Sequence, residues 1–555
     1  MSTSASSKAI RAGALMAALA VVVAACSSSG KSASNTTGGS TATTAAAAGT
    51  PILGGSLSFG LEAESPGYVP GISAMLAYSG GDVERAIYDP LTVYGPDGQA
   101  VPFLAQSVTP NSDFTQWTVT LRPNVTFASG TPLTAQSIAD DYSQYYSAKG
   151  SAAAGTFAEV KSVSATNPTT AVFTLSAPDA QFPVLLVTFY PFNPNVRQLY
   201  GADFASHPDG TGPFEFVSWQ RDNQIVLKAN PTYWGKDSAG RKLPYLSQLT
   251  LKIIVSGATR NATLQSGGIN GYQTVEAPIL SQAQQIPGVK VLLGDTGGYG
   301  WFINTSKAPV NDVRVRQALA YATDRNAIIA SQGAGSIISP RNQYYGPQSP
   351  YFSKAAADQY PNLDLTKAKA ALAAYVSDPK RSDGKAPGSP VSIQLNYLAG
   401  DPSSGAAVQL AKAEWGAIGV QVSLNALDEA TDVGAALKGA DQVFWFGWGS
   451  NVPYGLFHHN YTAPSVNPTN WTKLDDPIVE NAITALAQCT TLTCTQQSTA
   501  TIAQEFDAQL PVIFLMNTDQ GWAIDTAKVG GAEMAPGAGA GLDPVIQWAY
   551  LWAKK

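Results

Sequence analysis

The stretch "WTVTLRPNVTFASGTPLTAQSIADDY", residues 117–142, changes its hydrophobic period half-way along. Apolar residues first alternate with polar ones, which is typical of a half-buried strand, at Trp117, Val119 and Leu121. Thr134 then stands in a helix N-cap position, and apolar residues recur at helical spacing, at Ile138, Tyr142 and Tyr145. This stretch therefore predicts a strand, a turn and a helix.

The same alternation of strand and helix continues along the chain. The segment "VNDVRVRQALAYATDRNAII", residues 310–329, has helical spacing, with Asn311 or Asp312 as its cap. Further on, "VSIQLNYL" (391–398) predicts a strand, residues 406–418 a helix that ends at Gly419, and "VQVSLNAL" (420–427) a strand. Strand, helix, glycine and strand in that order indicate a βαβ unit, and hence an α/β fold.

The N-terminus is typical of an exported protein. Lys8 and Arg11 precede an unbroken run of small and apolar residues, 12–25, that ends at Cys26. A membrane span needs about 20 apolar residues, so the run indicates a secretory signal peptide, residues 1–25. The final "VAAC" resembles the bacterial lipobox, in which the cysteine is lipidated and becomes the mature N-terminus. An ordinary signal peptide with a chance cysteine is the alternative.

Residues 26–50 have the composition of a flexible linker, which is consistent with a membrane anchor at Cys26. They are almost entirely Ser, Thr, Gly and Ala, a composition that cannot bury a core. As a flexible coil this linker spans roughly 25–30 Å, enough to lift a globular domain off a bilayer. We expect the protein to be extracytoplasmic and lipid-anchored to the outer face of the bacterial cell membrane.

Composition limits the partners of the remaining chain. Charged residues make up 13% of the sequence and the net charge is −6, so no basic surface is available to follow phosphates. We expect no nucleic-acid partner. The length beyond the linker suggests two or three domains.

Two cysteines remain after Cys26, in the segment "CTTLTC". In an exported chain, Cys489 and Cys494 are expected to form a disulfide that closes a small loop. A redox or metal-binding pair is the alternative, although the spacing is not CxxC and no histidine lies nearby in the sequence.

Catalytic signatures are sparse. The chain has three histidines, at positions 207, 458 and 459, and no HExxH or GxSxG motif. His458 and His459 could bind a metal, but adjacent residues of an extended segment point in opposite directions. A hydrolase with a triad assembled only in space is a further alternative. We expect no enzyme, no cofactor and no metal site.

Several segments, read in order, resemble one family. They are "GGSLSFGLEAESPGYVP" (54–70), "IYDPLTVYGPDGQAVPFLAQSVT" (87–109), the opening stretch (117–142), "HPDGTGPFEFVSW" (207–219), "NPTYWG" (230–235), "WFINTSKAPVNDVRVRQALAYATDRNAII" (301–329), "GAIGVQVSLNALD" (416–428) and "DQVFWFGWGSN" (441–451). Together they resemble the extracytoplasmic solute-binding proteins of peptide/nickel-type ABC importers, family 5, from about Gly54 to Pro511.

The resemblance implies a two-lobed periplasmic-binding-protein fold of the class II type, in which the lobes close on a solute. Lobe I then comprises residues 51–81, 190–285 and 515–555, lobe II residues 286–514, and an additional subdomain on lobe I residues 82–189. It also implies a monomer that delivers a peptide-like solute to an ABC permease and its ATPase subunits.

The family places a wall of the binding cleft at "FWFGWGSNV". Peptide binders usually carry an aspartate shortly after the Gly-Trp pair, where it pairs with the ligand's α-ammonium group. That position is Asn451 here, preceded by Ser450. An amide replaces a charge-assisted bond with a weaker neutral one, so the solute is expected to be neutral, N-blocked, sugar-like, or a peptide held by its backbone.

Further candidate ligand contacts are mainly aromatic, and each could instead be a core residue: Trp448 with Gly449, Trp445, Tyr299, Trp301 and Tyr68. By strand alternation Trp445 and Phe446 face opposite sides, so one of them belongs to the core. Trp448, between two glycines, is the stronger candidate for a cleft wall. Competing functions are a sensory or adhesion module on the same scaffold, a nickel or metallophore receptor, and a secreted hydrolase.

Overall fold

The structure is a computed structural model of the chain and describes residues 50–70, 78–148, 153, 156–449, 452–465, 470–535 and 545–555. The chain divides into two units, residues 1–48 and residues 49–555. The predicted signal peptide, Cys26 and all but the last residue of the linker lie outside the described residues.

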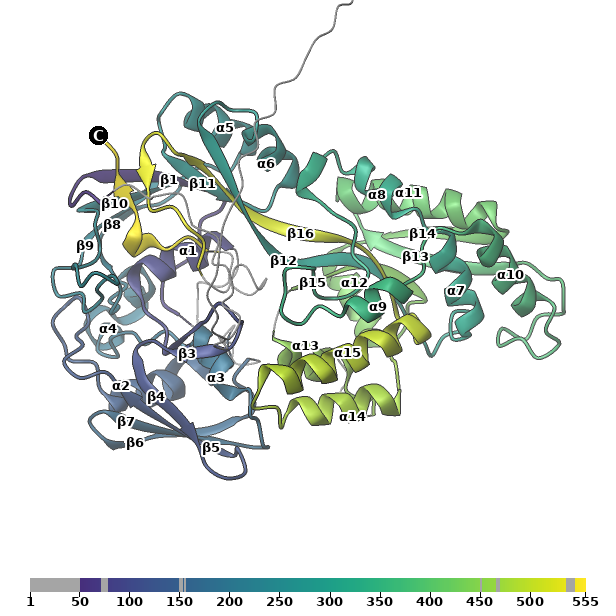
Figure 1. Ribbon diagram of the computed structural model, residues 1–555, viewed down its shortest axis with the longest axis horizontal. Coiled ribbons are helices and arrows are strands. Elements are labelled where there is room, and N and C mark those ends of the chain that lie inside the picture. The colour runs from purple at the N-terminus through teal and green to yellow at the C-terminus, as the bar shows by residue number, and fades with distance from the viewer. Residues whose placement is uncertain are drawn as a thin grey trace, which may run out of the picture. The chain divides into compact units, whose positions relative to one another are not determined.

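A mixed sheet of ten strands runs through the described part of the chain, in the order β14-β13-β15-β12-β16-β11-β1-β10-β9-β8. Its strands are β1 (Ser56–Leu61), β8 (Phe214–Gln220), β9 (Gln224–Ala229), β10 (Gln248–Ile253), β11 (Gly271–Thr274), β12 (Val289–Ile303), β13 (Val391–Leu398), β14 (Val420–Leu427), β15 (Val443–Gly449) and β16 (Val512–Asp525). The long strands β12 and β16 lie side by side at its centre (Figure 1).

On one side of this central pair, β1 runs parallel to β10 and β11, and β11 pairs antiparallel with β16. The core here is aromatic, since Phe59 contacts both Trp522 and Trp548 edge to face. The accompanying elements are α1 (Tyr78–Ile87), α4 (Val196–Tyr200), α5 (Gly257–Gln265), α6 (Ala277–Ala283), β17 (Val529–Gly530) and β18 (Trp552–Ala553).

On the other side, β13 runs parallel to β14 and β15, and β12 pairs antiparallel with β15. The predicted βαβ unit is confirmed, because α11 (Pro402–Ala417) connects β13 to β14 and Gly419 follows it with φ +102°. The other helices are α7 (Val313–Ala322), α8 (Arg325–Ser331), α9 (Lys354–Gln359), α10 (Leu365–Val376), α12 (Glu429–Leu437), α13 (Pro453–Tyr461), α14 (Pro477–Leu486) and α15 (Leu492–Gln509).

The helix expected over residues 310–329 is two helices. Asp312 caps α7, as its Oδ1 accepts a hydrogen bond from the Arg314 amide at 2.9 Å. Asp324 then caps α8 by accepting from the amides of Asn326 and Ala327. The second N-cap inside the run breaks the helix, because an aspartate that bonds downstream amides favours a new start over continuation.

Residues 82–189, called the 82–189 region below, contain a separate sheet in the order β4-β5-β7-β6. The elements of the 82–189 region are β2 (Thr92–Tyr94), β3 (Ala100–Pro102), β4 (Ala105–Pro110), β5 (Gln116–Leu121), α2 (Ala135–Asp141), β6 (Val160–Asn167), β7 (Thr170–Leu175) and α3 (Phe182–Leu185). The strand, turn and helix expected from residues 117–142 are confirmed. Thr134 accepts a hydrogen bond from the Ser137 amide at 3.2 Å and so caps α2.

The expected boundaries of the lobes, 51–81 with 190–285 and 515–555, 286–514, and the subdomain at 82–189, stay predictions. In the described residues the main sheet passes from its β1 side to its β13 side through β12 and β16. None of the helices described is both long and apolar enough to cross a membrane.

Candidate functional site

The centre of the β12–β16 pair is irregular. The pairing register shifts between Asp295 and Gly298 and again at Tyr299 and Gly300. Gly297 has φ +133°, and a Cβ atom there would lie 1.8 Å from the Trp448 carbonyl oxygen. A Cβ atom at Gly298 would lie 2.4 Å from the Met516 carbonyl oxygen of β16 and 2.4 Å from the Trp448 ring, so close strand packing on both sides of β12 requires these two glycines.

A buried ion pair lies beside this irregular segment. The Asp295 carboxylate contacts the Arg341 guanidinium, whose side chain is only 4% exposed. Burial raises the pKa of Asp295 although Arg341 opposes that shift. The Arg341 amide donates to the Leu515 carbonyl at 3.0 Å, so this segment is tied to both β12 and β16. No local pattern in the sequence indicates this pair, because its two residues lie 46 positions apart.

Trp448 is packed between Tyr344, which lies outside the helices, and Phe514 of β16. Its Nε1 donates to the Tyr344 carbonyl at 3.2 Å, and its ring contacts those of Tyr344 and Phe514 edge to face. The residue is 8% exposed. Gly449, which ends β15, is exposed, and Ser450 and Asn451 lie outside the described residues. The contact of these four residues with a solute stays a prediction.

The other aromatic candidates of this sheet form one stack. Tyr299 lies parallel to Trp445 with ring centroids 5.0 Å apart, and Trp445 contacts Trp301. Trp301 is fully buried and packs on Trp415 of α11, so the interpretation as a core residue applies to it. Trp445 and Phe446 face opposite sides as expected, and Trp445 is also largely buried. Half-buried Tyr299 is the most accessible of the stacked rings.

Tyr68 is also fully buried, against Trp219 with ring centroids 4.8 Å apart. Burial raises the pKa of its hydroxyl. This hydroxyl has no hydrogen-bond partner among the described residues, and residues 71–77 of the loop that follows lie outside them. A solute contact at Tyr68 therefore stays a prediction, on a residue whose ring belongs to the core.

The histidine pair lies on a helix, and the expectation of an extended segment is wrong. His458 and His459 are in the last turn of α13. His458 stacks on Tyr454 and lies 3.2 Å from a Glu159 carboxylate oxygen of the 82–189 region. Within the described residues no three His, Cys, Asp or Glu side chains gather in a way that could hold a metal ion.

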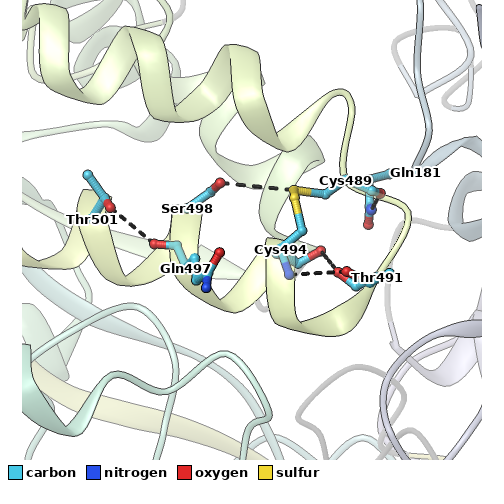
Figure 2. Close-up of a disulfide and its surroundings, with 8 residues drawn as sticks. Gln181, Cys489, Thr491, Cys494, Gln497, Ser498 and Thr501 are labelled. Carbon is cyan, nitrogen blue, oxygen red and sulfur yellow. Dashed lines mark hydrogen bonds between the residues drawn. A yellow bond between two sulfur atoms is a disulfide. The ribbon is translucent and has the colours of Figure 1, made fainter.

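Cys489 and Cys494 form a disulfide at the connection between α14 and α15. Figure 2 shows this bond with Gln181 of the 82–189 region beside Cys489. The Gln181 Nε2 donates to the Cys489 carbonyl at 2.6 Å, and both residues are buried. The disulfide therefore also borders a contact between distant parts of the chain.

Comparison with known proteins identifies the family. Residues 99–471 match the model of the "Bacterial extracellular solute-binding proteins, family 5 Middle". The chain belongs to this family. The resemblance seen in the sequence is confirmed, and the protein is an extracytoplasmic solute-binding member of a family that works with ABC permeases and is not enzymatic.

Individual relatives agree with this assignment. The "Probable D,D-dipeptide-binding periplasmic protein DdpA" of Escherichia coli is 28% identical over 366 residues, covering 64% of this chain and 67% of that protein. The "Nickel-binding periplasmic protein" of Escherichia coli is 26% identical over 407 residues, covering 69% and 74%. The solved structure of the ABC transporter substrate-binding protein CtaP of Listeria monocytogenes superposes with a TM-score of 0.73 at 20% identity, over 91% of this chain and all of that one. The expected two-lobed fold is thereby confirmed.

Proposed function

We propose that this family 5 protein captures a peptide-like solute between its two lobes and delivers it to an ABC permease. The observation that carries the proposal is the passage of the main sheet through β12 and β16, with irregular pairing and glycines at their centre. Irregular strand segments of this kind absorb the backbone rotations of a hinge. A solute that contacts both lobes then shifts the population toward the shut state.

A peptide-like solute is supported by the relative whose name gives a D,D-dipeptide as its ligand. The nickel-binding relative supports a metal-containing solute instead. The peptide is favoured because His458 already faces Glu159 and Tyr454, and because the described residues hold no suitable group of metal-ligating side chains.

The proposed contact surface combines Tyr299 of β12 with the end of β15 and the loop after it. Tyr299, Trp448 and Gly449 belong to the described part, and Ser450 and Asn451 continue the chain from there. An asparagine at position 451 offers an amide where a carboxylate would pair with a free ammonium group. Asn451→Asp should therefore raise affinity for peptides with a free N-terminus by about tenfold, the difference between a charge-assisted and a neutral hydrogen bond.

Calorimetry with matched free and N-acetylated peptides measures this effect. The gain should appear only with the free amine, and equal gains for both peptides would contradict the proposed contact. Mass spectrometry of the solute that co-purifies with the native protein tests the function itself. A peptide or peptide-like compound is the expected result, whereas a nickel chelate would replace the peptide proposal.

We also propose that Cys26 carries the lipid that holds the protein, as a monomer, at the outer face of the cell membrane. Cys26→Ser should move the protein from the membrane fraction to the soluble fraction. An unchanged distribution in cell fractionation would contradict the anchor.

A further inference from the structure

The disulfide-closed loop contacts a distant turn through main-chain atoms. The Ala180 amide donates to the Ala487 carbonyl at 2.8 Å, next to the bond from Gln181 Nε2 to the Cys489 carbonyl. All four residues are at most 9% exposed. Residues 179–181, called the latch turn below, and residues 487–494, the latch loop, are separated by about 300 positions in the sequence.

The latch turn is held in place by its own region. The Asp179 carboxylate accepts from the Gln181 amide at 2.7 Å, and the Asp179 carbonyl accepts from Trp117 Nε1 at 3.1 Å. The Asp179 amide donates to the Phe114 carbonyl. These bonds hold the turn against the β4-β5-β7-β6 sheet. The Ala180 amide and the Gln181 side chain therefore donate to the latch loop instead of to their own region.

The latch loop supplies acceptors that its own helix does not use. Ala487 is the C-cap of α14, where carbonyl groups lack partners within the helix and carry partial negative charge. The Cys489–Cys494 bond closes a short loop directly after this helix end and restricts its conformations. The two carbonyls are therefore held ready for the two donors of the latch turn.

Further contacts join the same two parts of the chain. The Tyr351 hydroxyl donates to the Gly98 carbonyl at 3.3 Å, and Gln99 Nε2 lies 3.5 Å from that hydroxyl. His458 lies 3.2 Å from Glu159. These polar contacts lie beside apolar packing, because Val184 belongs to the same hydrophobic cluster as buried residues of 286–514, and Tyr94 packs against that cluster. The contact between the 82–189 region and residues 286–514 is thus mixed in composition and distributed, as in interdomain interfaces whose parts move relative to one another.

We infer that the latch turn and the latch loop form a latch that stabilises the shut state of the solute site. This inference rests on the proposed two-lobed capture and adds its regulation. The latch contacts form before any solute binds, so their free energy shifts the equilibrium between the open and the shut state. This equilibrium sets the fraction of binding-competent protein and therefore the apparent affinity for the solute. Each latch hydrogen bond contributes about 1 kcal/mol net, about fivefold in the closing equilibrium.

Amide hydrogen exchange of the full-length chain, resolved by residue, tests the latch without requiring the solute. Gln181→Ala should speed exchange of the Ala180 amide about fivefold. The Asp179 amide, which bonds within the 82–189 region, should keep its rate and serves as the internal reference. The matched control is Gln136→Ala, because the exposed Gln136 side chain makes its hydrogen bond to Asp140 within its own helix.

The double variant Cys489→Ser/Cys494→Ser should also speed exchange at Ala180, and small-angle scattering should show a larger radius of gyration for both latch variants. Unchanged exchange at Ala180 in both variants would overturn the latch, and so would equal acceleration at Ala180 and Asp179, which indicates general loosening. If either of these results overturns the latch but a solute still co-purifies with the protein, the proposal of solute capture remains intact. Loss of the co-purified solute with an intact latch would instead contradict the proposed function.

Discussion

Replacing Arg341 by methionine should destabilise the protein by leaving the Asp295 carboxylate in its buried position without its cation. The Arg341 side chain is 4% exposed and that of Asp295 21%. Removing one partner of a buried ion pair costs about 3–5 kcal/mol, and the partial exposure of Asp295 places the expected loss near about 3 kcal/mol. Methionine keeps most of the length of the arginine stem, so a cavity adds little.

The loss should depend on pH in a defined direction. The pKa of Asp295 is already raised by burial, and without Arg341 it rises further. A carboxyl group with a raised folded-state pKa takes up a proton as the pH falls, which removes the cost of its buried charge. The difference between wild type and Arg341→Met should therefore be larger at pH 8 than at pH 5.

Urea unfolding followed by tryptophan fluorescence at both pH values measures these free energies of unfolding. Asp295→Asn in the Arg341→Met background should recover at least half of the loss and abolish its pH dependence. As a control, Lys354→Met breaks an ion pair whose side chains are 80% and 62% exposed, and should cost less than about 1 kcal/mol. A loss for Arg341→Met that is no larger than this control, or that grows as the pH falls, would refute the reasoning.

Two further predictions concern the β12–β15 contact and the latch turn. Gly297→Ala should lower the free energy of unfolding in urea by more than about 2 kcal/mol, because the new Cβ meets the Trp448 carbonyl at a positive φ. Gly449→Ala, where a Cβ has open space, should lower it by about 0.5 kcal/mol or less, and equal losses would contradict the packing described. Burial raises the pKa of Asp179 to about 7, so its carboxyl group destabilises the fold increasingly as the pH rises from about 4 to 7. Asp179→Asn keeps an acceptor for the Gln181 amide and should raise the melting temperature at pH 8 but not at pH 4; a decrease at pH 8 would contradict this.

The local elements and the family can be read from the amino-acid sequence. The period change over residues 117–142 and the cap at Thr134 specify β5 and α2, because hydrophobic periodicity and capping depend on residues a few positions apart. The break between α7 and α8 was missed although Asp324 is visible in the sequence, since its capping role competes with helical spacing that continues on both sides. The ordered family motifs also indicated the two-lobed fold.

Which side chains become buried and paired through long-range contacts depends on the packing of the folded chain. Strand alternation predicts that Trp445 and Phe446 lie on opposite faces of the sheet. That Trp301 belongs to the core follows from its contact with Trp415 of α11, which the sequence does not indicate. The partners Asp295 and Arg341, and likewise Gln181 and Cys489, lie far apart in the chain and meet through the packing of whole elements. Such pairs leave no local pattern, because their free energy comes from burial that exists only after the separate parts of the chain have come together.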